Sequence, residues 1–577
     1  MHLQRIKIGA FKNLKDVEII FSEVFQATYG EPSEKPIRSH AVIGQNGTGK
    51  SNLIEAIITL FRDVDLDREA GFDYELDYSI RGIKVQLQAD LAKQKRPFVW
   101  VDGKKESQGY LLEHKELLPS HIFAYYSGRN ERLEALFQEH QRRFNRRQEI
   151  TAEEVLPEQL LRNFTASESD IRLIEQLRKR EDSKTLRQFG DDKLRRLFYC
   201  RGGHSQLVLL ACLLSDDPVF TKVMHNLHIE SLESALFVLK QPHRLRGELK
   251  DDDILEGDPR FWYARGNVVS EFLDKLWQVA WAPIEHEETK LIDFRGRRER
   301  QKQLYLFVPS NDKLKELGNL IGGSDSFFRY AEGAYIGDLI EEVRITVKKR
   351  DEHGGKVSFT QLSEGELQIL TVLGLMRITQ GSESLFLLDE PDTHLNPIWK
   401  LRYFDDIESV LTPVNGIAGQ GESQIIITTH DPMMVGSLKR EQVHILRKQG
   451  NKTLVDTPDV DPQGMGVTGL LKSDLFGLSS TLDAETERRL HRRNYLFSLD
   501  ALRTPEENDE LTRLSAELAD LGFSNADFKD PYYAMFVRKM AQHTRFHKPA
   551  LSPEEQAEQD AIADEIINAI LKEDDAQ

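Results

Sequence analysis

The sequence has almost no cysteine and no long apolar run, and each of these absences removes a class of protein. Among 577 residues there are 2 cysteines, Cys200 and Cys212, too few for a disulfide framework or a zinc site. No stretch approaches the roughly 18 apolar residues of a membrane-spanning helix, and the N-terminus lacks the apolar segment of a signal peptide. We therefore expect a cytoplasmic protein with reduced, buried thiols and no membrane partner.

Metal and nuclease motifs are also missing. The 17 histidines show no H-E-x-x-H spacing and no paired-histidine nuclease pattern, and C-x-x-C does not occur. A formal net charge of -18 argues against a chain that coats nucleic acid nonspecifically. Arginine clusters leave a local nucleic-acid contact open, with a solvated helix face as the alternative. These clusters lie at Arg142–Arg143, Arg146–Arg147, Arg195–Arg196 and Arg295–Arg300.

A phosphate-binding loop stands near the start of the chain. Residues 44–51 fit G-x-x-x-x-G-K-[ST] and lie between the apolar run 41–43 and a helix pattern over 52–61. Glycines allow backbone N–H groups to converge on phosphates, and the helix N-terminus adds its dipole. We expect Lys50 to reach the β- and γ-phosphates and Ser51 to ligate Mg²⁺. The expected ATP-binding set is Gly44, Gln45, Asn46, Gly47, Thr48, Gly49, Lys50 and Ser51.

More than 300 residues after the phosphate loop, two further apolar runs are each followed by polar residues that could belong to an active site. Asp389 and Glu390 come directly after the run 385–388, at the strand end where open α/β sheets bind ligands. We expect Asp389 to hold Mg²⁺ and Glu390 to activate water as a general base. His430 ends the run 425–429 and is expected to contact the γ-phosphate or position water. The alternatives are a capping acid and a structural histidine.

A fourth motif, Leu362–Glu366, precedes an apolar helix pattern over 367–378. A serine and a glycine at a helix start offer a hydroxyl and bare N–H groups to a phosphate, so Ser363, Gly365 and Glu366 are candidate nucleotide contacts. The alternative is a simple helix cap, with Ser363 as N-cap and Glu366 closing a capping box.

Taken together, these motifs resemble the ABC-type ATPase heads of the Rad50/SMC/RecF group. Leu362–Glu366 resembles the ABC signature, Thr393–Asn396 the D-loop and His430 the switch histidine. Ile6–Leu14 resembles the first strand and its nucleotide-contacting turn, which adds Lys12 and Asn13 to the expected site. The resemblance implies a head-to-tail dimer in which the signature of one chain completes the phosphate loop of the other. The Q-loop is placed near Tyr126–Gly128 without a glutamine to mark it.

The expected fold is α/β: an ABC-type, SMC/Rad50-like P-loop ATPase head with a helical insertion and a mainly helical C-terminal region. Strand signals over 3–8, 17–21, 84–88, 98–101 and 121–126, and a hairpin over 343–359, support this reading. The expected domains are an N-terminal lobe with the phosphate loop (1–130), a mainly helical insertion (131–320), a C-terminal lobe with the other motifs (321–445), and a helical region for partner docking (446–577).

The interval between Lys50 and Ser363 is too short for the coiled-coil arms of Rad50 or SMC proteins. The C-terminal segments 470–478, 482–486 and 528–533 resemble the PtuA family, the ATPase subunits of bacterial Septu and retron-associated anti-phage systems. This resemblance implies an ATP- and Mg²⁺-dependent ATPase that controls a separate HNH nuclease subunit, and leaves a higher oligomer, a nucleic acid and a retron complex open as partners. The alternatives are a RecF/Rad50-like DNA-repair ATPase and a nuclease of the overcoming-lysogenisation-defect type. A nuclease of that type would carry an acidic metal cluster after His430. Asp456, Asp459 and Asp461 are interpreted instead as parts of a solvated loop.

Overall fold

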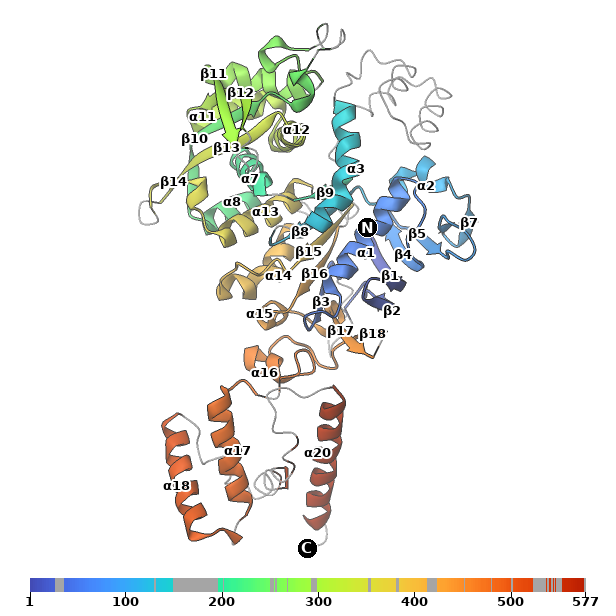
Figure 1. The fold of residues 1–577 in the computed structure, drawn as a ribbon, viewed down its shortest axis with the longest axis vertical. Helices are drawn as coiled ribbons and strands as arrows, with labels where there is room; N and C mark the ends of the chain where they lie inside the picture. The colour runs from blue at the N-terminus through green and yellow to red at the C-terminus, as the bar shows by residue number, and fades with distance from the viewer. Residues whose placement is uncertain are drawn as a thin grey trace. The chain divides into compact units, whose positions relative to one another are not determined.

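The computed structural model describes most of the chain in two compact units, Met1–Asp459 and Val460–Gln577. The described ranges are 1–25, 36–128, 131–148, 196–247, 257–291, 298–350, 354–379, 383–411, 423–499, 502–521 and 553–574, with single positions left out inside some of them and a few isolated residues between others. The first unit contains three sheets, and the second unit is described as helices (Figure 1).

A seven-stranded sheet lies at the centre of the first unit, in the order β18-β17-β3-β16-β15-β8-β9. The strands from β17 to β9 are parallel, and β18 pairs antiparallel with β17. All residues of β15 and β16 are buried, which explains their uninterrupted apolar runs. The strand bounds are β3 (Ser39–Gly44), β8 (His121–Tyr126), β9 (Leu197–Tyr199), β15 (Ser384–Asp389), β16 (Gln424–Thr429), β17 (Val443–Gln449) and β18 (Lys452–Asp456).

A six-stranded antiparallel sheet faces the first one across helix α1 (Lys50–Asp65). Side chains of both sheets and of α1 form one continuous buried cluster. Because α1 lies between two sheets, most of its residues are buried, among them Leu53, Ile54, Ile57 and Phe61. The sheet has the order β2-β1-β4-β5-β6-β7, with bounds β1 (His2–Phe11), β2 (Leu14–Ile20), β4 (Tyr74–Ile80), β5 (Ile83–Ala89), β6 (Phe98–Val101) and β7 (Lys104–Glu106).

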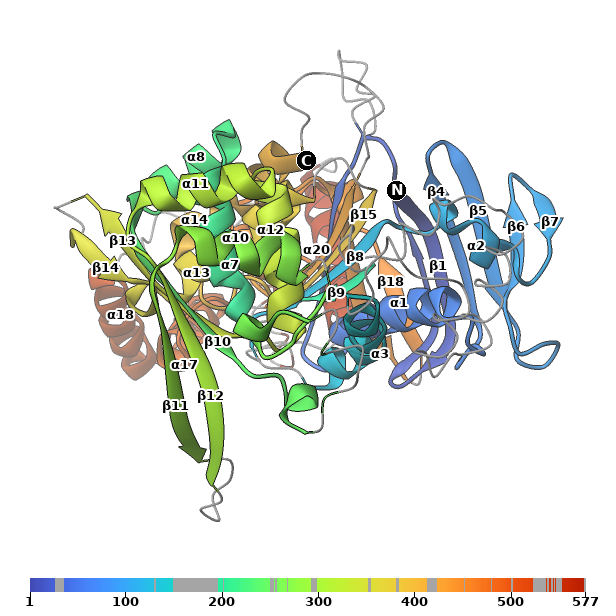
Figure 2. The same ribbon diagram turned by 90° about the horizontal axis from the view of Figure 1, so that it is seen from above.

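The third sheet corrects the sequence-based picture of the insertion. Besides helices, the segment predicted as mainly helical contains three long strands, which join the confirmed hairpin over 343–359 in the order β11-β12-β10-β13-β14. Figure 2 shows β11 and β12 extending away from the body of the first unit. The predicted boundary at 320/321 therefore falls inside one antiparallel sheet. The bounds are β10 (Ile229–Lys240), β11 (Trp281–Leu291), β12 (Arg298–Val308), β13 (Ile340–Lys349) and β14 (Lys356–Ser358).

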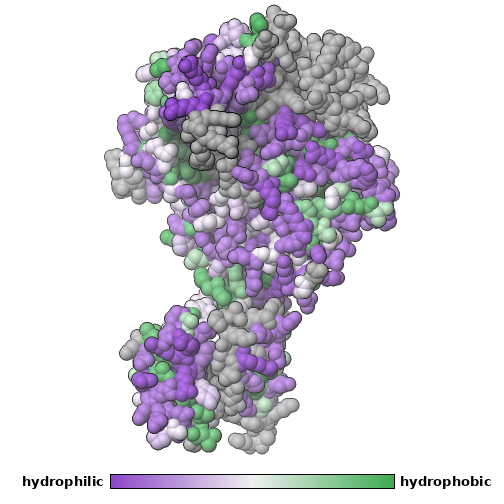
Figure 3. All heavy atoms as spheres, viewed as in Figure 1, coloured by the Kyte–Doolittle hydropathy of each residue, from purple (hydrophilic) through white to green (hydrophobic). Residues whose placement is uncertain are grey.

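The remaining helices of the first unit pack on these sheets. Helix α13 (Glu364–Ile378) contacts α7, α8, α12 and α14, and it lies on the other side of the central sheet from α1 (Figure 1). The face shown in Figure 3 is mostly hydrophilic over this unit. The other helices are α2 (Tyr110–Glu113), α3 (Glu131–Gln148), α7 (Gly202–Leu214), α8 (Pro218–Asn226), α10 (Asp274–Val279), α11 (Asn311–Ile321), α12 (Ser324–Ile336), α14 (Pro397–Leu411) and α15 (Pro432–Val435).

The second unit contains α16 (Gly466–Lys472), α17 (Ala484–Ser498), α18 (Pro505–Asp520) and α20 (Pro553–Asp574). Helix α17 is capped by Asp483, whose carboxylate accepts from the backbone N–H groups of Glu485 and Thr486. The predicted boundary at 445/446 lies inside β17, because β17 and β18 complete the central sheet beside β3. None of the helices within the described ranges is long and apolar enough to cross a membrane.

Candidate active site

The phosphate loop forms a cradle of backbone between β3 and α1. Gly44, Gly47 and Gly49 have φ values of 156°, 83° and 113°. A Cβ on Gly49 would lie 2.4 Å from the Leu14 side chain, so only glycine fits there. No side chain caps α1, and its first turn contains no acidic residue. The N–H groups of this turn are therefore not capped by a side chain of the helix start and are available to an anion, as phosphate binding requires. Gln45 and Asn46 are exposed on the rim of this loop.

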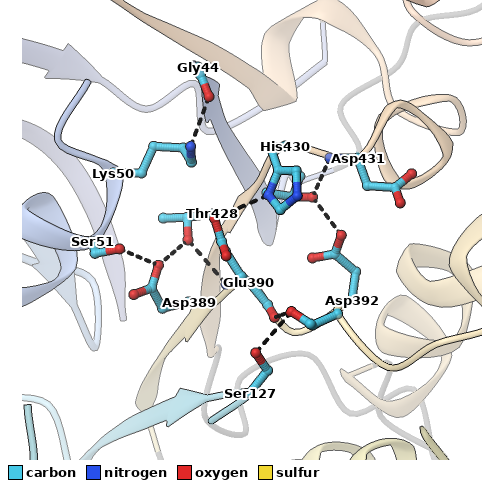
Figure 4. Close-up of polar contacts among 12 residues, drawn as sticks. Gly44, Lys50, Ser51, Ser127, Asp389, Glu390, Asp392, Thr428, His430 and Asp431 are labelled. Carbon is cyan, nitrogen blue, oxygen red and sulfur yellow. Dashed lines mark hydrogen bonds and ion pairs between the residues drawn. The ribbon is translucent and has the colours of Figure 1, made fainter. Parts of the chain in front are cut away.

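Lys50 begins α1 and is turned back over the loop. Its Nζ donates to the Gly44 carbonyl at 2.8 Å, as Figure 4 shows. Burial lowers the pKa of Lys50, and the nearby carboxylates of Glu390 and Asp389 oppose this effect. The carboxylates near Lys50 therefore offset part of the cost of burying its charge.

Lys12 and Asn13 both lie at the loop, but their polar groups are directed at protein. Asn13 Nδ2 donates to the Gly47 carbonyl at 2.9 Å, and Asn52 Nδ2 donates to Asn13 Oδ1 at 2.6 Å. Lys12 forms an ion pair with Glu55 of α1. Asn13 therefore stabilises the conformation of the loop. The sequence predicted direct contact with nucleotide and did not predict this structural role.

Asp389 ends β15 directly beside Ser51. Ser51 Oγ donates to Asp389 Oδ1 at 3.1 Å, and Thr428 Oγ1 donates to the same oxygen. The other oxygen, Oδ2, is buried and has no hydrogen-bond partner among the described residues. Burial is the main reason that the pKa of Asp389 is raised. A buried carboxylate oxygen without a partner, next to a serine hydroxyl, fits the all-oxygen ligand preference of Mg²⁺.

Glu390 and His430 form a pair at the same edge of the sheet. Glu390 has φ 49°, an unusual backbone conformation for a non-glycine residue. This turn is held because its N–H donates to the Thr428 carbonyl at 3.0 Å. Glu390 Oε1 then lies 3.1 Å from His430 Nδ1, and both side chains are partly exposed (27% and 54%). The pair thus faces solvent beside the buried Asp389 (Figure 4).

The signature segment forms the helix cap that we gave as its alternative. Ser363 Oγ accepts from Glu366 N at 3.2 Å, and Glu366 Oε2 accepts from Ser363 N at 2.8 Å. Lys349 Nζ lies 2.6 Å from Glu366 Oε1, and its charge and the capping bond lower the pKa of Glu366 against the effect of burial. Both carboxylate oxygens of Glu366 therefore have protein partners. The Ser363 hydroxyl accepts the capping bond and can still donate its own hydrogen.

Gly365 lies where the signature segment packs directly against the D-loop. A Cβ at this position would lie 2.6 Å from the His394 carbonyl oxygen. The two segments are also joined by an ion pair between His394 Nδ1 and Glu364 Oε2 at 3.0 Å. Among the described residues, no hydrogen bond or ion pair of Ser363 or Glu366 reaches residues 44–51. The chain thus holds the signature against its own D-loop.

Thr428 and Thr429 also belong to the site, although no role was predicted for them from the sequence. Thr428 and Thr429 are adjacent on β16, and they bond Asp389 and Asp392 respectively. Thr393 Oγ1 lies 2.9 Å from Ser127 Oγ and donates to the Glu390 carbonyl at 3.1 Å. The threonine pair before His430 was the available signal, because polar side chains at a buried strand end require partners. Asp456 ends β18 and lies 3.7 Å from Arg447, so it is not in a loop as predicted.

Comparisons with known proteins agree with this geometry. A family model described as "AAA domain, putative AbiEii toxin, Type IV TA system" matches residues 246–435, which include the signature, Asp389, Glu390 and His430. The chain is 27% identical over 254 residues to the Septu protein PtuA of Bacillus mycoides (strain KBAB4). In the described residues, the fold is an α/β fold in which a phosphate loop joins strand β3 of a mostly parallel sheet to helix α1.

The chain spans about a third of the length of the curated relative that it matches. The match to PtuA spans 42% of this chain and 32% of that protein. Among solved structures, an SMC head bound to the C-winged helix domain of ScpA covers 79% of this chain and 98% of its own, with 12% identity and a TM-score of 0.30. The SMC head domain from Thermotoga maritima covers 80% and 100%, also with 12% identity and a TM-score of 0.30.

Proposed function

We propose that this chain hydrolyses ATP with Mg²⁺ at the edge of the central sheet. The observation that carries the proposal is the placement of Glu390 and His430 beside Asp389, Ser51 and the phosphate loop. The divalent ion would be held by Ser51 and Asp389, and it would supply charge neutralisation of the phosphates. Glu390, whose side chain is 27% exposed, is the group that can accept a proton from water.

Residues of the chain would bind the phosphates and orient the general base. Lys50 brings a positive charge over the loop, and the backbone N–H groups at the start of α1 bind anionic oxygens. His430 Nδ1 holds Glu390 Oε1, which leaves the other carboxylate oxygen for water. The backbone of Glu390 is fixed by Thr428, so its side chain is aimed before substrate binds.

We further propose that the complete site requires two copies of the chain, packed head to tail. The support for this is the attachment of the signature to its own D-loop, while Ser363 and Glu366 have no described hydrogen bond or ion pair with the phosphate loop of the same chain. In such a dimer, the Ser363 hydroxyl of each copy is presented to the phosphate loop of the other, so both sites are shared.

Complementation between two defective variants tests this arrangement. Lys50→Ala removes the phosphate-loop charge, and Ser363→Arg blocks the signature, so we expect neither variant alone to hydrolyse ATP. In a mixture, each heterodimer pairs one intact phosphate loop with one intact signature. With random pairing and independent sites, an equimolar mixture should regain about a quarter of wild-type activity. Steady-state phosphate release checks this.

The controls for the mixture are the two variants measured alone at the same total concentration. Ser363→Arg is expected to bind ATP as wild type does, because Ser363 makes no contact with its own phosphate loop. Full hydrolysis by Ser363→Arg alone would show that one chain holds a complete site. Absence of recovery from folded, exchanging variants would contradict the head-to-tail dimer.

Similarity to PtuA supports a finer proposal, that the ATPase controls a separate HNH nuclease in bacterial anti-phage defence. We expect cells that express this chain together with a small HNH protein encoded beside it to form fewer phage plaques, and cells with either protein alone to gain no protection. Plaque counts over a phage panel measure this. A RecF-like repair role would instead give salt-sensitive binding of duplex DNA by the purified chain alone. Arg196 is not available for such binding, because it is used inside the protein with Asp65 and the Pro119 carbonyl.

A further inference from the structure

A cavity of about 590 Å³ lies beside the ATP site but is not part of it. It is formed where β8 and β9 end and where α7 and α13 begin, with Ser127 and His394 at its wall. No residue of the phosphate loop lines it, and neither do Asp389, Glu390 and His430. Its volume falls in the range of cavities that enclose small organic molecules.

One lining side chain indicates that the cavity holds a polar ligand. Gln368, in the second turn of α13, is 3% exposed and contributes to the cavity wall. Both Oε1 and Nε2 of its amide are buried without a hydrogen-bond partner among the described residues. Burial of an unpaired polar group costs about 1–3 kcal/mol, so a ligand that pairs with the amide removes this cost on binding.

The chemistry of the amide narrows the class of ligand. A primary amide presents one donor and one acceptor side by side, the same pattern through which Asn and Gln bind the edge of a nucleobase. Three tyrosines, Tyr125, Tyr126 and Tyr199, also line the cavity. Aromatic rings stack on any base because each base has a π face. A planar heterocycle is therefore favoured over an aliphatic ligand.

Among the described lining residues, two carboxylates disfavour a highly charged anion. Glu134 and Glu364 both line the cavity, and carboxylates repel phosphate but accept hydrogen bonds from sugar hydroxyls. Glu364 also lies 3.0 Å from His394, which lines the same cavity. Burial raises the pKa of the Cys200 thiol, so this lining residue stays protonated and is no nucleophile.

We propose that this cavity is a second, non-catalytic site that binds a nucleoside through the Gln368 amide, with its base among the tyrosines and its sugar toward the carboxylates. The occupant would lie near Ser127, whose hydroxyl contacts Thr393 and through it the Glu390 carbonyl. The site is independent of whether the chain hydrolyses ATP.

Equilibrium binding to the full chain tests the proposal. Adenosine, guanosine, cytidine and uridine are titrated calorimetrically into protein saturated with Mg²⁺ and ADP, so that the phosphate loop is already filled. We expect at least one nucleoside to bind with one site per chain. Gln368→Leu keeps the size of the side chain and removes the amide. It should weaken that binding tenfold or more, and leave the affinity for ADP as in wild type.

Thr371→Val is the matched control, one turn further along α13 on the same cavity wall. Its hydroxyl already donates within the protein and lies 2.8 Å from Ser205 Oγ. We expect its loss to change nucleoside affinity less than threefold. Gln368→Leu should melt no lower than wild type, because it removes an unpaired buried amide. If it does not fold, Gln368→Glu serves instead, since it removes both amide donors.

Three results would overturn the proposal. The first is that none of the four nucleosides binds to ADP-saturated protein. The second is that a nucleoside binds equally well to wild type and to Gln368→Leu. The third is that Lys50→Ala loses nucleoside binding while Gln368→Leu retains it, which would assign the nucleoside to the ATP site.

Discussion

Replacement of Glu390 by glutamine is expected to lower ATP hydrolysis at least a hundredfold while ATP still binds. The glutamine amide keeps the size of the side chain and its place beside His430, but it cannot accept a proton from water. Loss of a positioned general base costs roughly 10²–10⁴ in rate. Lys50, Ser51 and Asp389 are unchanged, so the affinity for ATP should remain within a few fold. Single-turnover hydrolysis and equilibrium binding of ATP separate the two effects.

The same variant should accumulate as a dimer when ATP is added, because a site that cannot hydrolyse ATP holds the two heads together. Size-exclusion chromatography with light scattering measures this. Glu316→Gln makes the same chemical change on α11, where the carboxylate pairs with Lys313 at the surface, and it should behave as wild type in both assays. Normal hydrolysis by Glu390→Gln would show that another group is the base.

Asp65→Ala is expected to destabilise the first unit by about 3–5 kcal/mol, the usual cost of removing one partner from a buried ion cluster. Asp65 ends α1 and is 8% exposed. Its carboxylate lies 3.2 Å from both Lys115 Nζ and Arg196 Nε, and 2.8 Å from His140 Nε2. Burial alone would raise the pKa of Asp65, but these neighbours hold it well below its usual range. Without the carboxylate, two cations remain partly buried without their partner.

Urea denaturation followed by tryptophan fluorescence measures this loss of stability. Glu69→Ala is the control, because its ion pair with Lys95 is exposed on both sides and should contribute less than about 1 kcal/mol. Asp65→Asn should be destabilised as well, since it keeps the shape and loses the charge. An Asp65→Ala protein as stable as wild type would show that the cluster does not hold α1, α3 and β9 together.

Local pattern was sufficient where a motif and its secondary structure lie in one stretch of chain. The phosphate loop stands between β3 and α1 as predicted, because glycines at positive φ and an uncapped helix start are properties of that segment itself. The hairpin of β13 and β14 and the strands leading to Asp389 and His430 were predicted for the same reason. Their apolar runs are long enough to identify buried strands.

Sequence patterns did not predict strands and contacts that depend on a partner elsewhere in the chain. Strands β10, β11 and β12 were not predicted. In β11 and β12 the polar and apolar residues fall in separate halves of the strand instead of alternating. All three strands are stabilised by pairing across gaps in sequence, which propensity does not record. The arginine at 196 was grouped with surface charges, although it pairs with Asp65 far away in the chain. Asn13 and Glu366 were predicted to contact nucleotide, and the sequence did not show that their polar atoms also bind the protein.

The sequence by itself determined which chemical groups the ATP site contains, because a glycine loop, a strand-end carboxylate pair and a strand-end histidine each require only a short local pattern. The tertiary structure alone decided how those groups meet. Parallel pairing places β16 between β3 and β15, which brings Asp389 to Ser51 and Glu390 to His430. It also decided that the signature rests on its own D-loop and that an unpaired glutamine faces a separate cavity. These arrangements depend on contacts between residues tens to hundreds of positions apart, and such contacts have no local signal in the chain.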